Sequence, residues 1–280
     1  MNDERAALEA EIDARPDDRR RYAVLADWYQ EHGDARGELM ALQLSSTGSD
    51  REAELIAAEH VDARDVKWRW GFVESLRFER TTHRDDWTER LLAPLLAHPA
   101  CRFLRSLELD VGPGDQALTW LADNAPKTLT SLALTCNEAD FSLVRGRLTQ
   151  LESLRFAAQL LVPGVLPPMR ALELPVDAMT DAGLVHVLGT QPRLKALTLT
   201  SLEGLHAPTM QAVIQLRLES LTLRASLTTI DAVQVLTTSW MKNTLQTLDV
   251  SESGLTEEAA RALLDAVPNF SRLSSLVVGA

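Results

Sequence analysis

A pattern of three apolar residues, spaced apolar-x-x-apolar-x-apolar, occurs nine times in this 280-residue chain. In an extended strand, successive side chains point to opposite sides, so the last two apolar residues of each pattern lie on one face. One short strand cannot bury such a face alone, whereas stacked copies share a continuous core. The patterns therefore predict a parallel sheet built from repeats. They begin at Val73, Leu104, Leu129, Leu151, Met169, Leu194, Leu218, Leu245 and Leu273, at intervals of 18 to 31 residues.

Parallel strands need crossover connections, and the segments between the patterns favour helices. In the last crossover, Thr256 precedes two acidic residues and an apolar stripe, which is typical of a capped amphipathic helix. Similar helices are predicted at Asp85–Ala97, Gln116–Asn124 and residues 181–188. The 18-residue step from Leu151 to Met169 differs, because Pro163-Gly164 and Pro167-Pro168 leave no room for a helix. We expect a turn or an extended connection there.

The first 66 residues have a different pattern, of short helices separated by helix-breaking residues. Pro16 ends the first helix, because the residue before a proline resists helical geometry. Asp17 or Asp18 can cap the second helix. Gly33 can take the left-handed conformation that stops it, and Asp34 can cap the third. The predicted helices span residues 4–14, about 18–32, 38–44 and 51–60.

The charge distribution divides the chain in the same way. Residues 1–66 contain 8 Lys and Arg against 17 Asp and Glu, a net charge of −9, whereas residues 67–280 carry −3. We therefore predict a small all-α module at 1–66 and a domain of about nine repeats at 67–280. Neither part has the basic face that binds nucleic acid or an anionic membrane, so we expect neither as a partner.

The repeat patterns resemble leucine-rich repeats over residues 73–280. That resemblance implies an α/β leucine-rich repeat solenoid, with the parallel β-sheet on the concave face and helices on the convex face. The first segment resembles the bacterial repeat-companion domain, a short helical module found ahead of repeats, which implies an architecture and no particular activity. The matching stretches are Pro16-Asp17-Asp18, Leu25-Ala26-Asp27-Trp28, Gly33-Asp34-Ala35-Arg36-Gly37-Glu38 and Leu42-Gln43.

The composition also indicates the compartment and the available chemistry. There is no run of about 18 apolar residues, as a transmembrane helix requires, and the first residues lack the basic-then-apolar order of a secretory signal. Cys101 and Cys136 cannot form a disulfide framework, and the six histidines show no metal-ligand spacing. We expect a reduced, cytoplasmic protein with no metal and no cofactor.

No catalytic residues are predicted, and we expect a protein that is not an enzyme. The nearest approach to a nucleophile and a base is His98 with Cys101, just before a repeat strand, where a small buried cysteine is ordinary. A less favoured alternative is a hydrolase or transferase with its site at the joint between the two domains. That site would combine Asp27, Arg36, Glu38 and Trp70.

The two ends of a stacked sheet need covering. At the domain joint, Trp68 and Trp70 are expected to seal the first repeat strand under the helical module, and the other tryptophans to lie in the core. At the other end, no capping helix is predicted after the final strand, Ser275–Gly279. An open edge can pair with another chain. A second possible function is therefore a subunit of a homo- or hetero-oligomer, assembled through this edge or through the acidic N-terminal module.

The function predicted first is that of a non-catalytic adaptor or scaffold, which binds a protein partner of unknown identity on the exposed face of the sheet. Strand alternation places the residues between the repeat leucines on that face. Many are small or carry a hydroxyl group, and charges of both signs are scattered among them, which suits hydrogen bonding to a protein or peptide. The predicted partner-binding residues are Arg77, Glu108, Asp110, Arg155, Glu173, Thr198, Thr222, Arg224 and Asp249.

Overall fold

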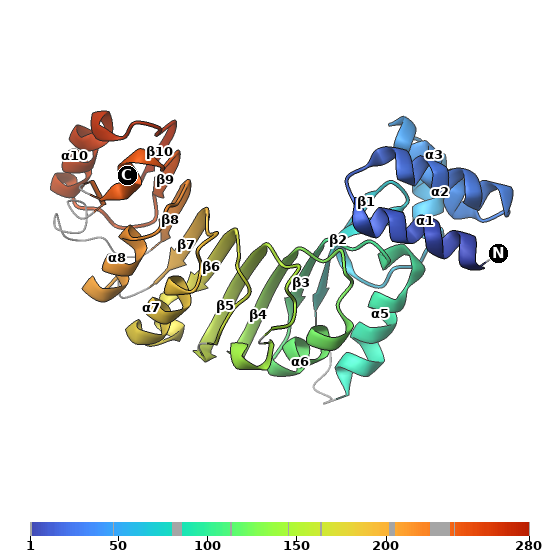
Figure 1. Cartoon of the computed structure of the whole chain (residues 1–280), viewed down its shortest axis with the longest axis horizontal. Coiled ribbons are helices and arrows are strands. Elements are labelled where there is room, and N and C mark those ends of the chain that lie inside the picture. The colour runs from blue at the N-terminus through green and yellow to red at the C-terminus, as the bar shows by residue number, and fades with distance from the viewer. Residues whose placement is uncertain are drawn as a thin grey trace. The chain divides into compact units, whose positions relative to one another are not determined.

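The structure is a computed structural model, and it describes residues 2–46, 48–79, 86–112, 114–144, 146–162, 164–201, 205–224, 236–237 and 239–279. Over these residues the chain is a mixed α/β protein with ten strands, most of them parallel, and a helical N-terminal region. It divides into two compact units (Figure 1): unit 1 contains residues 1–110 and 124–131, and unit 2 contains residues 111–123 and 132–280. The domain boundary predicted at residue 66 stays a prediction.

Helices make up the described N-terminal segment of unit 1, and the sequence predicts their ends well. The Asp18 and Asp34 side chains cap α2 and α3 by accepting backbone N–H groups at 3.1 and 2.9 Å. Gly33, at φ +71°, separates these two helices. α2 packs against both α1 and α3, and α4 packs on α3. The helices are α1 (Asn2–Ala14), α2 (Arg19–Glu31), α3 (Ala35–Ser45) and α4 (Asp50–Ala58), as predicted to within a few residues.

A β-hairpin that the sequence analysis did not predict precedes the parallel strands. β1 (Arg64–Arg69) pairs antiparallel with β2 (Phe72–Glu79). The connecting residues, Trp70 and Gly71, both have positive φ angles, +52° and +83°. A two-residue turn of this kind matches the twist of the flanking strands. The expectation of a wholly parallel sheet is therefore wrong at β1, because this tight turn reverses the chain without a crossover.

The buried core of unit 1 joins the helices to the first strands. The ring of Tyr22, in α2, lies 4.8 Å from Trp70, 6.2 Å from Phe72 and 5.7 Å from Phe103, measured between centroids. Phe72 and Phe103 are buried in the same cluster as Tyr22, with Trp70 packed against it. The prediction that Trp70 packs under the helices is confirmed. Trp68 is half-buried on β1.

Ion pairs also hold the helices of unit 1 against its strands. Arg102 binds Asp13 of α1 at 2.5 Å, and Asp17 accepts from Arg105 at 2.5 Å and from Arg69 at 3.2 Å. The hydrogen bond from Arg105 outweighs the opposing effect of burial and lowers the pKa of Asp17 below its usual value. Ion pairs at the α1–α2 corner therefore hold these helices in place in addition to the packing of the aromatic core.

The remainder of unit 1 follows the predicted strand–helix–strand order. A π-helical turn, η1 (Thr88–Leu92), continues into α5 (Ala93–Ala97), and a short 3₁₀ turn, η2 (Pro99–Cys101), leads to β3 (Ser106–Asp110). β3 is parallel to β2, with Leu76 opposite Leu107 and Phe78 opposite Leu109, all four of them buried. The predicted helix at 85–97 is confirmed from Thr88 onward, and Asp85 lies outside the described residues.

Unit 2 contains the repeats that the apolar patterns predict. From β5 onward each strand pairs in parallel with the next along the chain. The first leucines of β6 to β9, Leu172, Leu197, Leu221 and Leu248, form one row across the strands, and each is at most 2% exposed. The strands are β4 (Ser131–Asp140), β5 (Ser153–Val162), β6 (Ala171–Pro175), β7 (Ala196–Thr200), β8 (Ser220–Arg224), β9 (Thr247–Val250) and β10 (Ser275–Val278).

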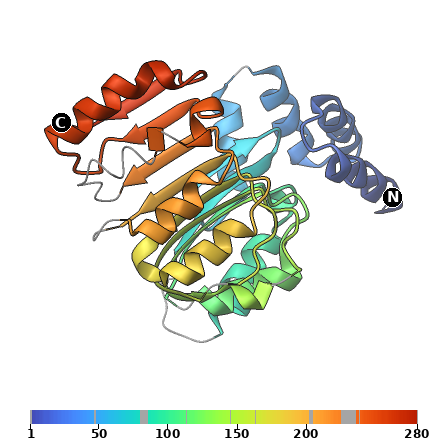
Figure 2. The same ribbon diagram turned by 60° about the vertical axis from the view of Figure 1, so that its left-hand side comes forward.

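Helices of unit 2 connect these strands and lie along one side of them (Figures 1 and 2). Thr180 and Thr256 cap α7 and α10, each by accepting a backbone N–H of the first turn at 3.2 Å. The caps and acidic first turns confirm the predicted helix starts. The helices are α6 (Gly114–Asn124), α7 (Asp181–Gly189), α8 (Ala207–Ile214) and α10 (Glu257–Ala266); 3₁₀ turns are η3 (Phe141–Val144), η4 (Val176–Ala178), η5 (Trp240–Asn243) and η6 (Val267–Asn269).

The proline-rich step between β5 and β6 lacks a helix over its described residues, 164–170, as predicted. β5 is instead extended to ten residues. The backbone N–H of Met169 donates to Oε1 of Gln191 at 2.8 Å, and both residues are buried. A side chain from the loop after α7 thus satisfies a backbone donor at the start of the same repeat, before β6.

The tryptophans do not all lie in the core. Trp87 is fully buried, whereas Trp240 is 76% exposed. The prediction of a buried position is wrong for Trp240 because η5 is a short turn, which buries Met241 instead. Within the described ranges, no helix has the length and apolarity needed to cross a membrane.

Candidate functional site

The residues predicted to bind a partner all lie on the face of the strands opposite the buried leucines. In β3, β6 and β7, half-buried positions alternate strictly with buried ones, as the pattern predicts. Arg155 and Arg224 are exposed, and the other seven predicted residues are half-buried. We call these nine residues the strand face. Their position is as expected, and their role in binding stays a prediction.

In unit 1, the strand face is a compact charged cluster around Arg77. Its guanidinium lies 3.2 Å from Asp110, 3.4 Å from Glu79 and 3.8 Å from Glu108, and Arg64 binds Glu79 at 3.0 Å. Burial by itself lowers the pKa of Arg77, but the hydrogen bond to Asp110 and the neighbouring carboxylates raise it overall. Two cations thus face three carboxylates, which leaves this cluster net negative.

In unit 2, five of the six predicted residues form one row across five neighbouring strands, β5 to β9. Parallel strands in register hold such side chains at the spacing of the strands, about 4.8 Å. The row has a cation and then a carboxylate at one end, two hydroxyl groups, and a second carboxylate at the other end. Its members are Arg155, Glu173, Thr198, Thr222 and Asp249, each opposite the next. The structure therefore brings together residues separated by almost 100 positions in the sequence.

Two further contacts set the charge of this row. Asp249 accepts hydrogen bonds from the backbone N–H (3.0 Å) and the hydroxyl (2.7 Å) of Ser251, and these two bonds lower its pKa. Arg224, which follows Thr222 by two residues on β8, lies 3.9 Å from Glu173 and 3.7 Å from Glu252. Ion pairs this long on a surface contribute little to stability, so Arg224 is free to re-pair with a ligand.

The candidate chemical groups at the domain joint do not converge. Arg36 is buried and binds Glu59 at 3.2 Å, whereas Glu38 binds Arg51 at 2.8 Å on the surface. Trp70 packs on Tyr22, as described above. Among the contacts of the described residues, none joins any two of the four residues suggested for this site.

The two cysteines have the properties of buried thiols. Burial, aided by the charge of Glu59, raises the pKa of Cys101 to about 12, and burial raises that of Cys136 to about 11. Nδ1 of His98 accepts a hydrogen bond from the backbone N–H of Ala100 at 3.2 Å. In the part of the chain that the structure describes, no group of three or more His, Cys, Asp or Glu side chains is arranged to hold a metal ion.

Sequence analysis missed a pocket in unit 1, next to the Arg77 cluster. It has a volume of about 420 Å³ and is lined by residues from three separate segments: 60–64, the end of β2, and 90–98. The sequence predicts the end of a helix at residue 60 and a domain boundary at residue 66, and no element between them. The pocket depends on the unpredicted hairpin, which brings the residues before β1 alongside β2, so no local sequence signal marks it.

Comparison with known proteins identifies no family for this chain. No protein-family model matches the sequence, and no curated protein is similar to it. Among solved structures, this chain is similar to a chain in the structure of the Toll–Spatzle complex, which is described as a molecular hub in Drosophila development and innate immunity. The TM-score is 0.43 and the sequence identity 11%, over 73% of this chain and 30% of that chain.

Proposed function

We propose that this chain is a leucine-rich repeat adaptor of the bacterial cytoplasm that binds a protein partner on its strand face and catalyses no reaction. In this proposal the parallel strands form the concave face of a solenoid and the connecting helices its convex face. Extended faces of this kind offer a large binding area without an active-site pocket. The identity of a partner is a separate question from the fold, which supports many functions.

The row Arg155, Glu173, Thr198, Thr222 and Asp249 is the observation that carries this proposal. These side chains are aligned by strand pairing and remain at least partly accessible. No outward position of β2 to β10 is aromatic among the described residues, so the face offers hydrogen bonds and charges rather than apolar anchors. Such a face contributes specificity and association rate more than raw affinity.

The N-terminal helices support the proposal in a different way. They bury Phe72 and Phe103, the aromatic residues beside the first strands, under Tyr22. A repeat domain needs such a cap because the end of its stacked core is otherwise exposed to water. We therefore assign the companion-like module a structural role, as the cap of the first repeat.

The test is capture of a partner from native cytoplasm, with charge reversal on the row. Arg155→Glu and Glu173→Lys are expected to abolish stoichiometric capture, because each reverses a charge on the row and so repels the partner group that pairs with it. Arg193→Glu is the matched control, an equal change of charge at an exposed position in the loop between α7 and β7. Equal capture by all variants would contradict binding at the row.

A second candidate function is assembly through β10. Its residues are exposed or half-buried in alternation, whereas Leu248 of the preceding β9 is fully buried. Val277, opposite Asp249, is 43% exposed. Light scattering of the purified protein tests this possibility. A mass that rises with concentration, and falls back when Val277→Lys is introduced, is the result expected for edge-mediated assembly.

A further inference from the structure

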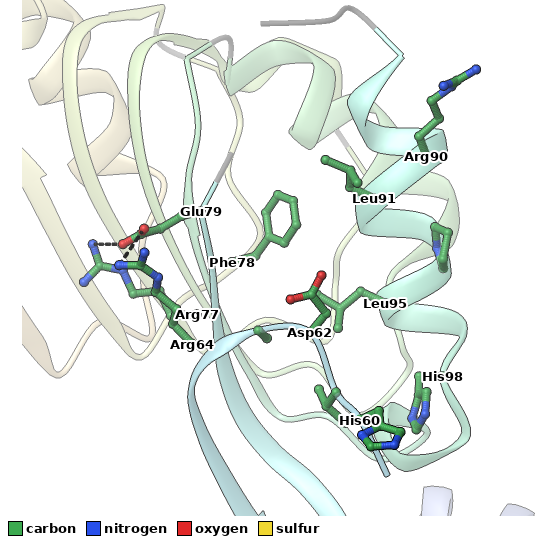
Figure 3. Close-up of a pocket in the computed structure, with 13 residues that line it drawn as sticks. His60, Asp62, Arg64, Arg77, Phe78, Glu79, Arg90, Leu91, Leu95 and His98 are labelled. Atoms are coloured by element: carbon green, nitrogen blue, oxygen red, sulfur yellow. Dashed lines mark ion pairs between the residues drawn. The ribbon is translucent and has the colours of Figure 1, made fainter. Parts of the chain in front are cut away.

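The pocket in unit 1 has the features of a binding site for one cationic side chain. Its volume, about 420 Å³, falls within the range of roughly 300–1,000 Å³ that is typical of ligand pockets. Figure 3 shows Phe78 of β2 facing the helix that carries Leu91 and Leu95, with the segment around Asp62 on the near side. The pocket lies wholly within unit 1.

One wall of the pocket is apolar and held in place. Phe78 stacks on the fully buried Trp87, with ring centroids 5.8 Å apart and planes 16° apart. Leu91 is 36% exposed, and Leu95 lies one helical turn further on. This wall can bury methylene groups of a ligand, at roughly 0.8 kcal/mol for each buried CH₂.

The arginines of the pocket are already paired. Arg64 and Arg77 both bind Glu79, at 3.0 and 3.4 Å, and Arg90 binds Asp86 at 2.7 Å. Figure 3 shows the first two pairs on the strand side, away from the helix. With Glu108 and Asp110 also beside Arg77, a ligand meets arginines whose charges are already compensated by carboxylates.

Among the described residues that line the pocket, Asp62 is the carboxylate that forms no ion pair. Its carboxylate points into the space between Phe78 and the helix (Figure 3), and it forms no ion pair with any other described residue. At the rim, His98 uses Nδ1 to accept a backbone N–H, so its neutral ring carries a proton on Nε2, which is then free to donate. The pocket thus combines an apolar wall, one unpaired anion and one hydrogen-bond donor.

We propose that this pocket binds a lysine or arginine side chain from a basic segment of the protein partner. The cationic head pairs with Asp62 and the methylenes lie along Phe78 and Leu91. Lysine and arginine are the side chains that combine an apolar stem with a cationic head. His98 can donate to a carbonyl of the partner's backbone. This inference rests on the proposed adaptor function and names the chemistry of the partner.

Continuity with the strand face favours a protein segment over a free amine. Arg77 and Glu79 line the pocket and also belong to the charged cluster that includes Glu108 and Asp110. A chain whose basic side chain occupies the pocket would continue across this cluster, which is itself net negative. Charge complementarity therefore extends over both surfaces.

The experiment selects peptides from a random dodecapeptide library on the full-length protein and measures their affinity by calorimetry. Selected peptides are expected to share one Lys or Arg. Asp62→Asn should weaken their binding by about ten- to a hundredfold, since it removes a charge-assisted pair. Asp65→Asn is the matched control: it makes the same change on an exposed neighbour outside the pocket, and asparagine tolerates the positive φ there. Replacing the peptide's basic residue by norleucine should have the same effect as Asp62→Asn.

Each outcome decides the proposal. Peptides that lack a basic residue, or that bind Asp62→Asn as tightly as the native protein, overturn it, as does failure to select any peptide that depends on Asp62. Asp62 is exposed, so this variant should fold, and an unchanged urea midpoint verifies that it does. If n-butylamine binds as tightly as the selected peptide, the site is one for free amines and the protein-segment assignment is wrong. The adaptor function fails separately, when Arg155→Glu and Glu173→Lys leave partner capture intact.

Discussion

Replacing Gln191 by leucine tests how the proline-rich repeat is held. Gln191 is 2% exposed, and its Oε1 accepts the N–H of the fully buried Met169 at 2.8 Å. Leucine has a similar volume, so the variant removes an acceptor without opening a large cavity. An unpaired buried N–H costs about 1–3 kcal/mol of folding free energy. We therefore expect Gln191→Leu to lower the free energy of unfolding by about 2 kcal/mol.

Two measurements check this value. Urea unfolding followed by circular dichroism gives the change in stability of the whole chain. Hydrogen exchange of the Met169 amide reports on the bond itself, and about 2 kcal/mol corresponds to exchange roughly thirtyfold faster. Gln215→Leu is the control, because Gln215 is exposed at the end of α8 and its replacement should change stability by less than about 0.5 kcal/mol.

The predicted role of the Met169–Gln191 hydrogen bond is refuted if Gln191→Leu and Gln215→Leu unfold at the same urea concentration and the Met169 amide exchanges at its native rate. That result would mean that water or another group satisfies the N–H after the substitution. A loss of stability without faster exchange at Met169 would also refute it, since the cost would then come from packing and not from the hydrogen bond.

Three further perturbations follow from unit 1. Gly71→Ala should lower the thermal midpoint by several degrees, because a Cβ at φ +83° would lie 2.1 Å from a side-chain carbon of α3; an unchanged midpoint contradicts this. The hydrogen bond from Arg105 lowers the pKa of Asp17 below 3.8. The ionised Asp17 carboxylate therefore stabilises the folded protein above that pH, and this contribution is lost as the pH falls through the pKa of the folded state. Asp17→Asn should therefore destabilise the protein at pH 7, by less than about 1 kcal/mol for so exposed a group, and have no effect near pH 2, as urea titrations at both pH values would show. Cys101, with its pKa raised to about 12 by burial, should react with Ellman's reagent at pH 8 only after unfolding, and rapid labelling of the native protein would show that it is accessible.

Much of the architecture follows from local pattern. The repeat leucines predict the strands because alternation is a property of the extended chain itself. Asp18, Asp34 and Thr256 predict helix starts because capping is a contact with the next few residues. Each of these interactions spans only a few positions, so a single sequence is enough to identify it.

Other features of the fold have no such local signal. The residues Trp70 and Gly71 form a hairpin turn, yet the residues before them have no clear alternating pattern that would predict β1. Trp240 belongs to a residue type that is highly buried on average, and its exposure here depends on which neighbour, Met241, fills the core. Competition between adjacent side chains for the same core is decided only when the whole unit packs.

The candidate sites divide in the same way. The sequence by itself determined which side chains face away from the leucines, so the nine residues of the strand face could be named in advance. Only the tertiary structure decided that five of them align in one row, because that depends on strand register across repeats of unequal length. It also decided the pocket around Asp62, because a hairpin and a helix distant in sequence must pack together to form its walls. Alternation and capping act between near neighbours, whereas register and cavities arise from contacts between distant residues.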